Sequence, residues 1–251
     1  MTLLASFLCR FAWGMCMALA LTPASIVPSG FFRMNLLVIL GLATGASLTI
    51  ASSVEGMFWS LPAIAAVAAW IGSVLWLGDR RRGGMIATVL AGGFLASAGV
   101  WMNLCASNTS DVAASSMGVA VAGIVSGLVT GLTVNAMLLG HWYLNSPGMS
   151  VGALRQSVNW TLFACSMQLV ISIAGIPSIA ALPFDASIAS LVALRWIAGL
   201  AGLPFLLYMT RKVLEIPNTQ SATGILYVAC LAAIVGELSS QLVATRTHWP
   251  V

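Results

Sequence analysis

This sequence contains very few charged residues. Only 6% of its 251 residues are charged, and 60% are hydrophobic, whereas roughly a quarter of a soluble domain is charged. So few charges cannot cover a surface that faces water, which excludes a soluble globular protein. The net charge of +4 gives no basis for nucleic-acid binding, because the basic residues lie in short loops between apolar runs.

Patterns of metal-binding cysteines are absent as well. The five cysteines are scattered and include no C-x-x-C pair, which excludes a disulfide framework and a tetrahedral zinc site. Cys9 and the run Met15-Cys16-Met17 contain the soft ligands that copper prefers. Methionine and cysteine are also ordinary packing residues of apolar helices, so we expect no bound metal.

Histidine is rare, and the common catalytic motifs are missing. A haem held by two histidines needs a pair within neighbouring helices. His141 and His248 are the two histidines, and we expect them at opposite membrane faces. We therefore expect no covalently bound or histidine-ligated cofactor. No nucleophile triad, phosphate-binding loop or HExxH motif occurs, so the sequence assigns no enzyme class.

Long apolar runs are abundant. Runs of about 20 residues, enough to cross a bilayer about 30 Å thick, recur along the whole chain. They are too long and too continuous for the strands of a membrane barrel, so only helices can span. We predict an all-α fold, a polytopic transmembrane bundle of about eight spans that forms one transmembrane domain over residues 1–251. The expected spans are 3–21, 34–51, 58–77, 85–104, 118–143, 158–176, 188–208 and a last one from after Pro217 to 243.

The loops predict the orientation. One side of the membrane receives seven basic residues: Arg33, Arg80, Arg81, Arg82, Arg155, Arg211 and Lys212. The other side receives Glu55, Asp111 and Asp185, with Arg246 as its one basic group. Because basic loops stay in the cytoplasm, we expect cytoplasmic arginine-rich loops and outside N- and C-termini, in a cell (inner) membrane.

The predicted helix 118–143 carries a row of glycines. Gly123, Gly127 and Gly131 recur at four-residue spacing, which favours close approach of a neighbouring helix. Asn135 continues this face, and His141 follows at the inner end. His141 could hydrogen-bond a quinone carbonyl or a lipid headgroup, since histidine suits proton exchange near neutral pH. A single histidine at the interface is also an ordinary interfacial residue.

Three ionisable residues lie within predicted spans, where charge is costly and marks candidate functional sites. They are Arg10, Arg195 and Glu237. Counting about 1.5 Å per residue from the helix ends places all three about 9–11 Å below the outer boundary. Charges at one depth can pair, so we predict that Glu237 pairs with Arg195 and Arg10, with Ser240 and Gln241 one turn further on.

Two interpretations of this group stay open. In one, a structural ion pair holds three helices together. In the other, a polar pocket opens outward, with Glu237 as a proton acceptor or ligand-binding group and an arginine as its partner. Two arginines with one glutamate would also accept an anionic ligand.

One family shows a resemblance to this pattern. Eight spans, outside termini and no haem ligands resemble the membrane anchor subunits of the polysulfide and dimethyl sulfoxide reductase family. Gly236-Glu237-Leu238 is similar to a Gly-Glu-Leu often found in their last span. The resemblance implies a subunit that passes electrons between quinol and an iron–sulfur partner. It would place Glu237 near a quinone site, with His141 as a second candidate.

The leading hypothesis is therefore an integral membrane subunit of a respiratory or redox complex. It would lie in the lipid bilayer, anchor other membrane or peripheral redox subunits, interact with quinone and bind no metal of its own. The alternative is a small-solute, ion or proton transporter with a polar site at Arg10, Arg195 and Glu237. A third hypothesis is a purely structural membrane subunit.

Overall fold

The computed structural model describes residues 2–52, 57–106, 113–146, 150–177, 185–216 and 218–247. Within these ranges there is no strand, and eight helical stretches are long and apolar enough to cross a membrane. The predicted all-α polytopic fold is therefore confirmed. Three residues used in the predictions above lie outside the described residues: Glu55, Asp111 and His248.

Several helices begin earlier than the apolar runs predicted. The elements are α1 (Thr2–Leu21), α2 (Ser29–Ala51), η1 (Met57–Trp59), α3 (Ser60–Leu77), α4 (Arg81–Ala106), α5 (Ala113–Asn145), α6 (Gly152–Ala174), α8 (Ala186–Leu194), η2 (Arg195–Gly202), α9 (Leu203–Val213) and α10 (Thr219–Thr247). Helix α2, for example, begins at residue 29 instead of 34, and α6 at 152 instead of 158. Arg33 and Arg155 interrupt the apolar runs, whereas the hydrogen bonding of the helix continues across them.

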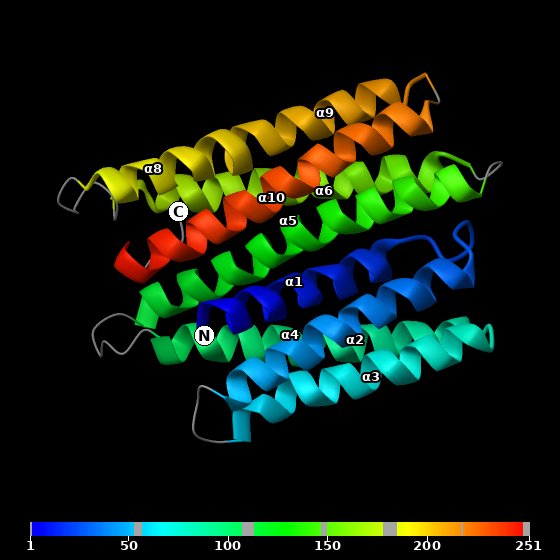
Figure 1. Cartoon of the computed structure of the whole chain (residues 1–251), viewed down its shortest axis with the longest axis horizontal. Coiled ribbons are helices and arrows are strands. Elements are labelled where there is room, and N and C mark those ends of the chain that lie inside the picture. The colour runs from blue at the N-terminus through cyan, green and yellow to red at the C-terminus, as the bar shows by residue number, and fades with distance from the viewer. Residues whose placement is uncertain are drawn as a thin grey trace.

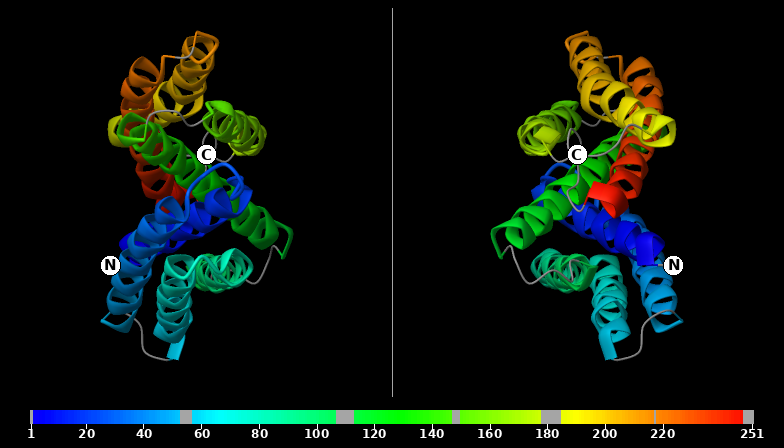
Figure 2. Two further views of the ribbon diagram at one scale, coloured as in Figure 1. Left: turned by 90° about the vertical axis from the view of Figure 1, so that its right-hand side faces the viewer. Right: turned by 90° about the vertical axis from the view of Figure 1, so that its left-hand side faces the viewer.

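The helices form two groups of four. In the N-terminal group, α1, α2, α3 and α4 each pack on the next, and α4 packs back on α1. In the C-terminal group, α5, α6, α9 and α10 close in the same way, with α8 and η2 completing the span that ends in α9. Figure 1 shows the two groups side by side, and Figure 2 shows them from the two ends. They meet mainly where α1 packs against α5.

Small residues bring α1 and α5 into close contact, as the glycine row predicted. A Cβ atom on Gly131 would overlap the backbone of Gly14, and a Cβ atom on Gly127 would overlap the backbone carbonyl of Arg10. Neither position therefore has room for a side chain. The partner of the row is α1, and the contact fixes the backbone of Arg10 against the middle of α5.

The seventh span is irregular in its middle. It consists of α8, the π-helical segment η2 and α9. Pro204 lies in the first turn of α9, where it has no N–H to donate and its ring crowds the carbonyl one turn earlier. The wider hydrogen bonding of a π-helix relieves this crowding just before the proline. Arg195, the first residue of η2, lies at the start of the irregular segment.

Two helix starts have side-chain caps. Asn218, the residue before α10, accepts a hydrogen bond from the backbone N–H of Ser221 (3.0 Å). Asp185 caps α8 by accepting bonds from the N–H (3.0 Å) and hydroxyl (2.8 Å) of Ser187. These bonds from Ser187 hold the pKa of the Asp185 carboxyl below its usual value.

The start of α1 and the end of α10 lie at the same end of the bundle (Figure 1). The basic connections lie at the other end and hold neighbouring loops together. Arg81 donates to the carbonyl of Ala24 (2.9 Å), and Arg155 donates to the carbonyl of Leu214 (2.9 Å). The even number of spans thus separates the chain ends from the arginine-rich loops.

The glycine contact predicts a sharp difference between two alanine substitutions. Gly131→Ala should destabilise the protein by about 1–3 kcal/mol, because α1 and α5 must move apart to admit a methyl group. Gly41→Ala on α2, where an added Cβ meets nothing within 4 Å, should change stability by less than about 0.5 kcal/mol. Thermal unfolding in a mild detergent measures both, and equal melting temperatures for the two variants would contradict the packing assigned to Gly131.

Candidate functional site

Glu237 is the centre of a buried polar cluster between the two groups of helices. The residue lies on α10 and is only 2% exposed. Arg10 from α1 donates to its Oε1 atom (3.3 Å), and Gln241, one turn further along α10, donates to the same oxygen (2.6 Å). The hydroxyl of Ser126 on α5 donates to the other oxygen, Oε2. Three different helices thus supply donors to one carboxylate.

Arg195 is the second cation of the cluster. It is 5% exposed and lies close enough to Glu237 for a direct electrostatic interaction. Two glycines make room for it: a Cβ atom on Gly236 would lie 2.7 Å from the Cα atom of Gly199, and one on Gly199 would lie 3.1 Å from Nη1 of Arg195. The close approach of η2 and α10 therefore brings Arg195 beside the carboxylate.

Glu237 forms a direct salt bridge with Arg10. The charge of Arg195 also acts on Glu237. The sequence predicted both partners, with Arg195 first. Gln241 was also expected nearby and binds the carboxylate, whereas Ser240 is buried on the same helix. The three charges that share a predicted depth are thus brought together.

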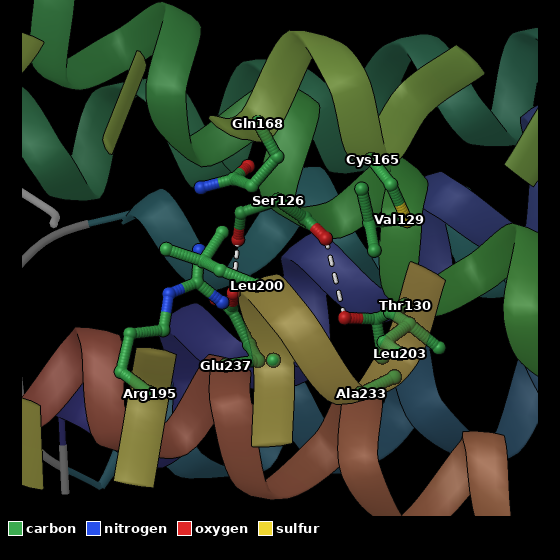
Figure 3. Close-up of a pocket in the computed structure, with 11 residues that line it drawn as sticks. Ser126, Val129, Thr130, Cys165, Gln168, Arg195, Leu200, Leu203, Ala233 and Glu237 are labelled. Carbon is green, nitrogen blue, oxygen red and sulfur yellow. Dashed lines mark hydrogen bonds between the residues drawn. The ribbon is translucent and has the colours of Figure 1, made fainter. Parts of the chain in front are cut away.

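A small cavity borders Glu237 on the side of α6 and η2. Its lining includes Ser126, Cys165, Gln168, Arg195 and Glu237, and Figure 3 shows how they are arranged. The centre of a water molecule has about 10 Å³ in which to move there, which is room for about one water. Gln168 is 2% exposed, and neither atom of its amide has a hydrogen-bond partner among the described residues.

A groove lies on the opposite side of Arg10, between α4 and α5. It has a volume of about 460 Å³ and is lined by Ala96, Ser97, Val100, Trp101 and Ile124. Ala96, Val100 and Ile124 also line a narrow neck, which reaches Arg10 and Trp13. The groove is open and mostly apolar, and Arg10, whose guanidinium group binds Glu237, is one of the residues that line its neck.

The remaining candidates lie elsewhere. Asn135 is buried and donates to the hydroxyl of Thr22 (3.2 Å). His141 is exposed, and its Nδ1 atom lies 3.1 Å from the hydroxyl of Tyr227. His141 is 15 residues beyond Ser126 on α5, a distance of about 22 Å along the helix. Neither residue therefore belongs to the cluster around Glu237.

Sequence reasoning missed Ser126 and Gln168, although a signal for both was present. Ser126 is eight residues inside the predicted span 118–143, and Gln168 is eight residues before the end of 158–176. Both positions are about 12 Å below the outer boundary by helix rise, close to the depth of the three charges. Applying the depth argument to neutral polar residues as well would have found them.

Removing the charge of Glu237 should strongly destabilise the protein. Glu237→Gln removes the buried carboxylate that forms a salt bridge with Arg10 and interacts with Arg195, at a cost of about 3–5 kcal/mol. Arg10→Met leaves one balanced pair and should cost less. Glu215→Gln is the matched control, because Glu215 forms an exposed pair with Lys212 (3.2 Å) that contributes little. Thermal unfolding of the three variants tests this order, and a Glu237→Gln protein as stable as Glu215→Gln would contradict it.

The Glu237→Gln variant also separates a functional role of Glu237 from a structural one. Loss of activity in protein that still assembles normally would indicate function, while loss of the assembled protein alone would indicate an ion pair with a structural role.

Comparison with protein-family models, curated proteins and solved structures finds no match to this chain. What the protein does has therefore to be inferred from the residues of the cluster and their contacts.

Proposed function

We propose that this chain is an integral membrane subunit of a redox complex and that it binds quinone in the groove between α4 and α5. The observation that carries the proposal is the position of this groove. An apolar groove of about 460 Å³ leads through a neck to Arg10, which forms a salt bridge with Glu237. Apolar sites of several hundred cubic ångströms with a few polar groups are typical of small-molecule binding.

The chemistry of the groove suits a lipid-soluble ligand. Its lining residues are mostly apolar and include Trp101, one face of which already stacks on the ring of Phe58. A quinone carries its ring and tail in the bilayer and exposes two carbonyl oxygens. Arg10 and the indole of Trp13 are the polar groups nearest the neck. The indole N–H of Trp13 already donates to the carbonyl of Ile124 (3.2 Å), so Arg10 is the donor proposed for a quinone oxygen.

Glu237 has the proposed role of proton acceptor. Oxidation of a quinol to a quinone releases two protons and two electrons. A carboxylate that already accepts bonds from Arg10, Ser126 and Gln241 is proposed to take up one of these two protons, and the second proton is proposed to leave to water at the membrane surface. The two electrons need an acceptor in a partner subunit, for which an iron–sulfur protein is the proposed class. In this scheme the chain itself holds no metal.

The quinone ring is proposed to stay in the groove. The cavity beside Glu237 and the neck beside Arg10 each leave about 10 Å³ for the centre of a water molecule, which is too little for a ring. Arg10 therefore separates the ligand from the proton acceptor. His141 takes no part in this scheme, because it lies at the other end of α5.

Purification in a mild detergent tests the proposal. We expect an iron–sulfur or cytochrome subunit and bound quinone to co-purify with the chain. Ala96→Trp fills the groove and should lower the quinone content about 10-fold or more. Val67→Trp on α3 is the control, since Val67 is exposed outside the groove. An isolated oligomer without quinone would contradict the proposal and favour the transporter or the purely structural subunit.

A further inference from the structure

Two buried polar side chains of α6 lack hydrogen-bond partners. Gln168 is 2% exposed, and Ser172 is fully buried. Neither atom of the Gln168 amide nor the hydroxyl of Ser172 has a partner among the described residues. Buried hydroxyl groups such as those of Thr130 and Thr161 instead donate to the carbonyl four residues earlier (3.2 and 2.9 Å). Because an unsatisfied polar group in an apolar interior is costly, Gln168 and Ser172 require partners other than these side chains.

Gln168 lines the small cavity beside Glu237, together with Ser126, whose hydroxyl binds the carboxylate. Figure 3 shows Gln168 and Ser126 on neighbouring helices, with Ser126 between Gln168 and Glu237. The cavity leaves about 10 Å³ for the centre of a water molecule. A cavity of this size holds about one water if its walls are polar, whereas an apolar cavity stays empty. The amide of Gln168 and the hydroxyl of Ser126 provide the hydrogen-bonding groups that such a water needs.

Ser172 extends the row of unsatisfied groups toward the end of the helix. It lies one turn beyond Gln168, about 6 Å along the helix axis, and two residues before α6 ends at Ala174. A bridging water with two hydrogen bonds of about 2.8 Å each spans a similar distance. Polar groups that need water therefore follow one another from Glu237 to the end of α6.

We propose that the cavity holds one ordered water molecule on Gln168, and that this water and Ser172 form a path by which Glu237 exchanges protons with the membrane surface at the end of α6. In each transfer, the O–H bond of the Glu237 carboxyl breaks as the cavity water accepts the proton. That water then gives a proton to the next water, so the carboxylate and a neutral water are restored.

The proton path rests on the role of proton acceptor proposed above for Glu237, whereas the bound water does not. The charged groups that act on Glu237 are Arg10 and Arg195. Cys165 is a further titratable group in the lining of the cavity, and its thiol provides a local probe of water.

Exchange of thiol hydrogen tests for the bound water. Infrared spectroscopy follows the conversion of S–H to S–D after transfer of the protein to D₂O, and the band lost in Cys165→Ala identifies Cys165. Cys16, identified in the same way by Cys16→Ala, is the control, because it is buried and is not part of the cavity lining. We expect Cys165 to exchange at least about 10-fold faster than Cys16. Equal rates would show that the cavity is dry and would overturn the proposal.

Substitutions on α6 locate the path. Gln168→Leu removes the groups that hold the water, and Ser172→Ala removes the hydroxyl nearer the helix end. Each should slow the exchange of Cys165 about 10-fold or more. Gln156→Leu and Ser166→Ala, the same changes at exposed positions of α6, are the controls and should leave the rate unchanged. A rate that stays unchanged in either Gln168→Leu or Ser172→Ala would overturn the path along α6.

Proton exchange at Glu237 is measured directly in the isolated chain. The sequence has three glutamates, Glu55, Glu215 and Glu237, so Glu55→Gln with Glu215→Gln and ¹³C-labelled glutamate leaves one labelled carboxyl group. Its carboxylic acid band is followed by infrared spectroscopy after a rapid drop in pH. Ser172→Ala should slow the appearance of this band about 10-fold or more. An unchanged rate would overturn the proton path.

The outcomes separate this inference from the function proposed above. If Glu237 stays ionised at every pH at which the protein is folded, the proton path and the acceptor role of Glu237 are both wrong, and the exchange of Cys165 still decides the bound water. If the chain protonates as expected but co-purifies without quinone, only the proposed function is contradicted.

Discussion

The burial of one carboxylate between two guanidinium groups is the interaction on which the rest of the structure depends. Glu237 accepts donors from α1, α5 and α10, and Arg195 approaches from η2. Each of these charges would be costly in hydrocarbon alone, so the helices that carry them have to stay together. The cluster thus joins the N-terminal group of helices to the C-terminal group at a contact between α1 and α10 that is otherwise small.

Small residues make this burial possible. The contact of Gly127 and Gly131 with α1 fixes the backbone at Arg10, and the contact of Gly199 with Gly236 admits the side chain of Arg195. Without a hydrophobic driving force between helices in lipid, such close packing and polar contacts provide most of the association energy. The same geometry leaves an open groove between α4 and α5 and a small cavity beside Glu237. The groove supports the proposed quinone site.

The sequence predicted the class of fold and the members of the charged cluster, because apolar runs and intramembrane charges are strong local signals. It predicted helix starts less well, since Arg33 and Arg155 interrupt the apolar runs but not the helices. The π-helical segment at Arg195 was missed, because Pro204 indicates a disturbance but not its form. Ser126 and Gln168 were missed because the depth argument was applied to charged residues alone. The groove at Ala96 depends on how helices far apart in the chain are packed, and no pattern within one helix specifies that. The orientation in the membrane stays a prediction.

The most direct test of the central interaction is a double-mutant cycle between Arg10 and Glu237. The free energy of unfolding is measured for Arg10→Met, Glu237→Leu and the double variant. If the salt bridge of 3.3 Å holds the two groups of helices together as described, the coupling energy should exceed about 1.5 kcal/mol. If the changes in the free energy of unfolding caused by the two single substitutions add up to that of the double variant within about 0.5 kcal/mol, the two residues act independently. That result would contradict this account.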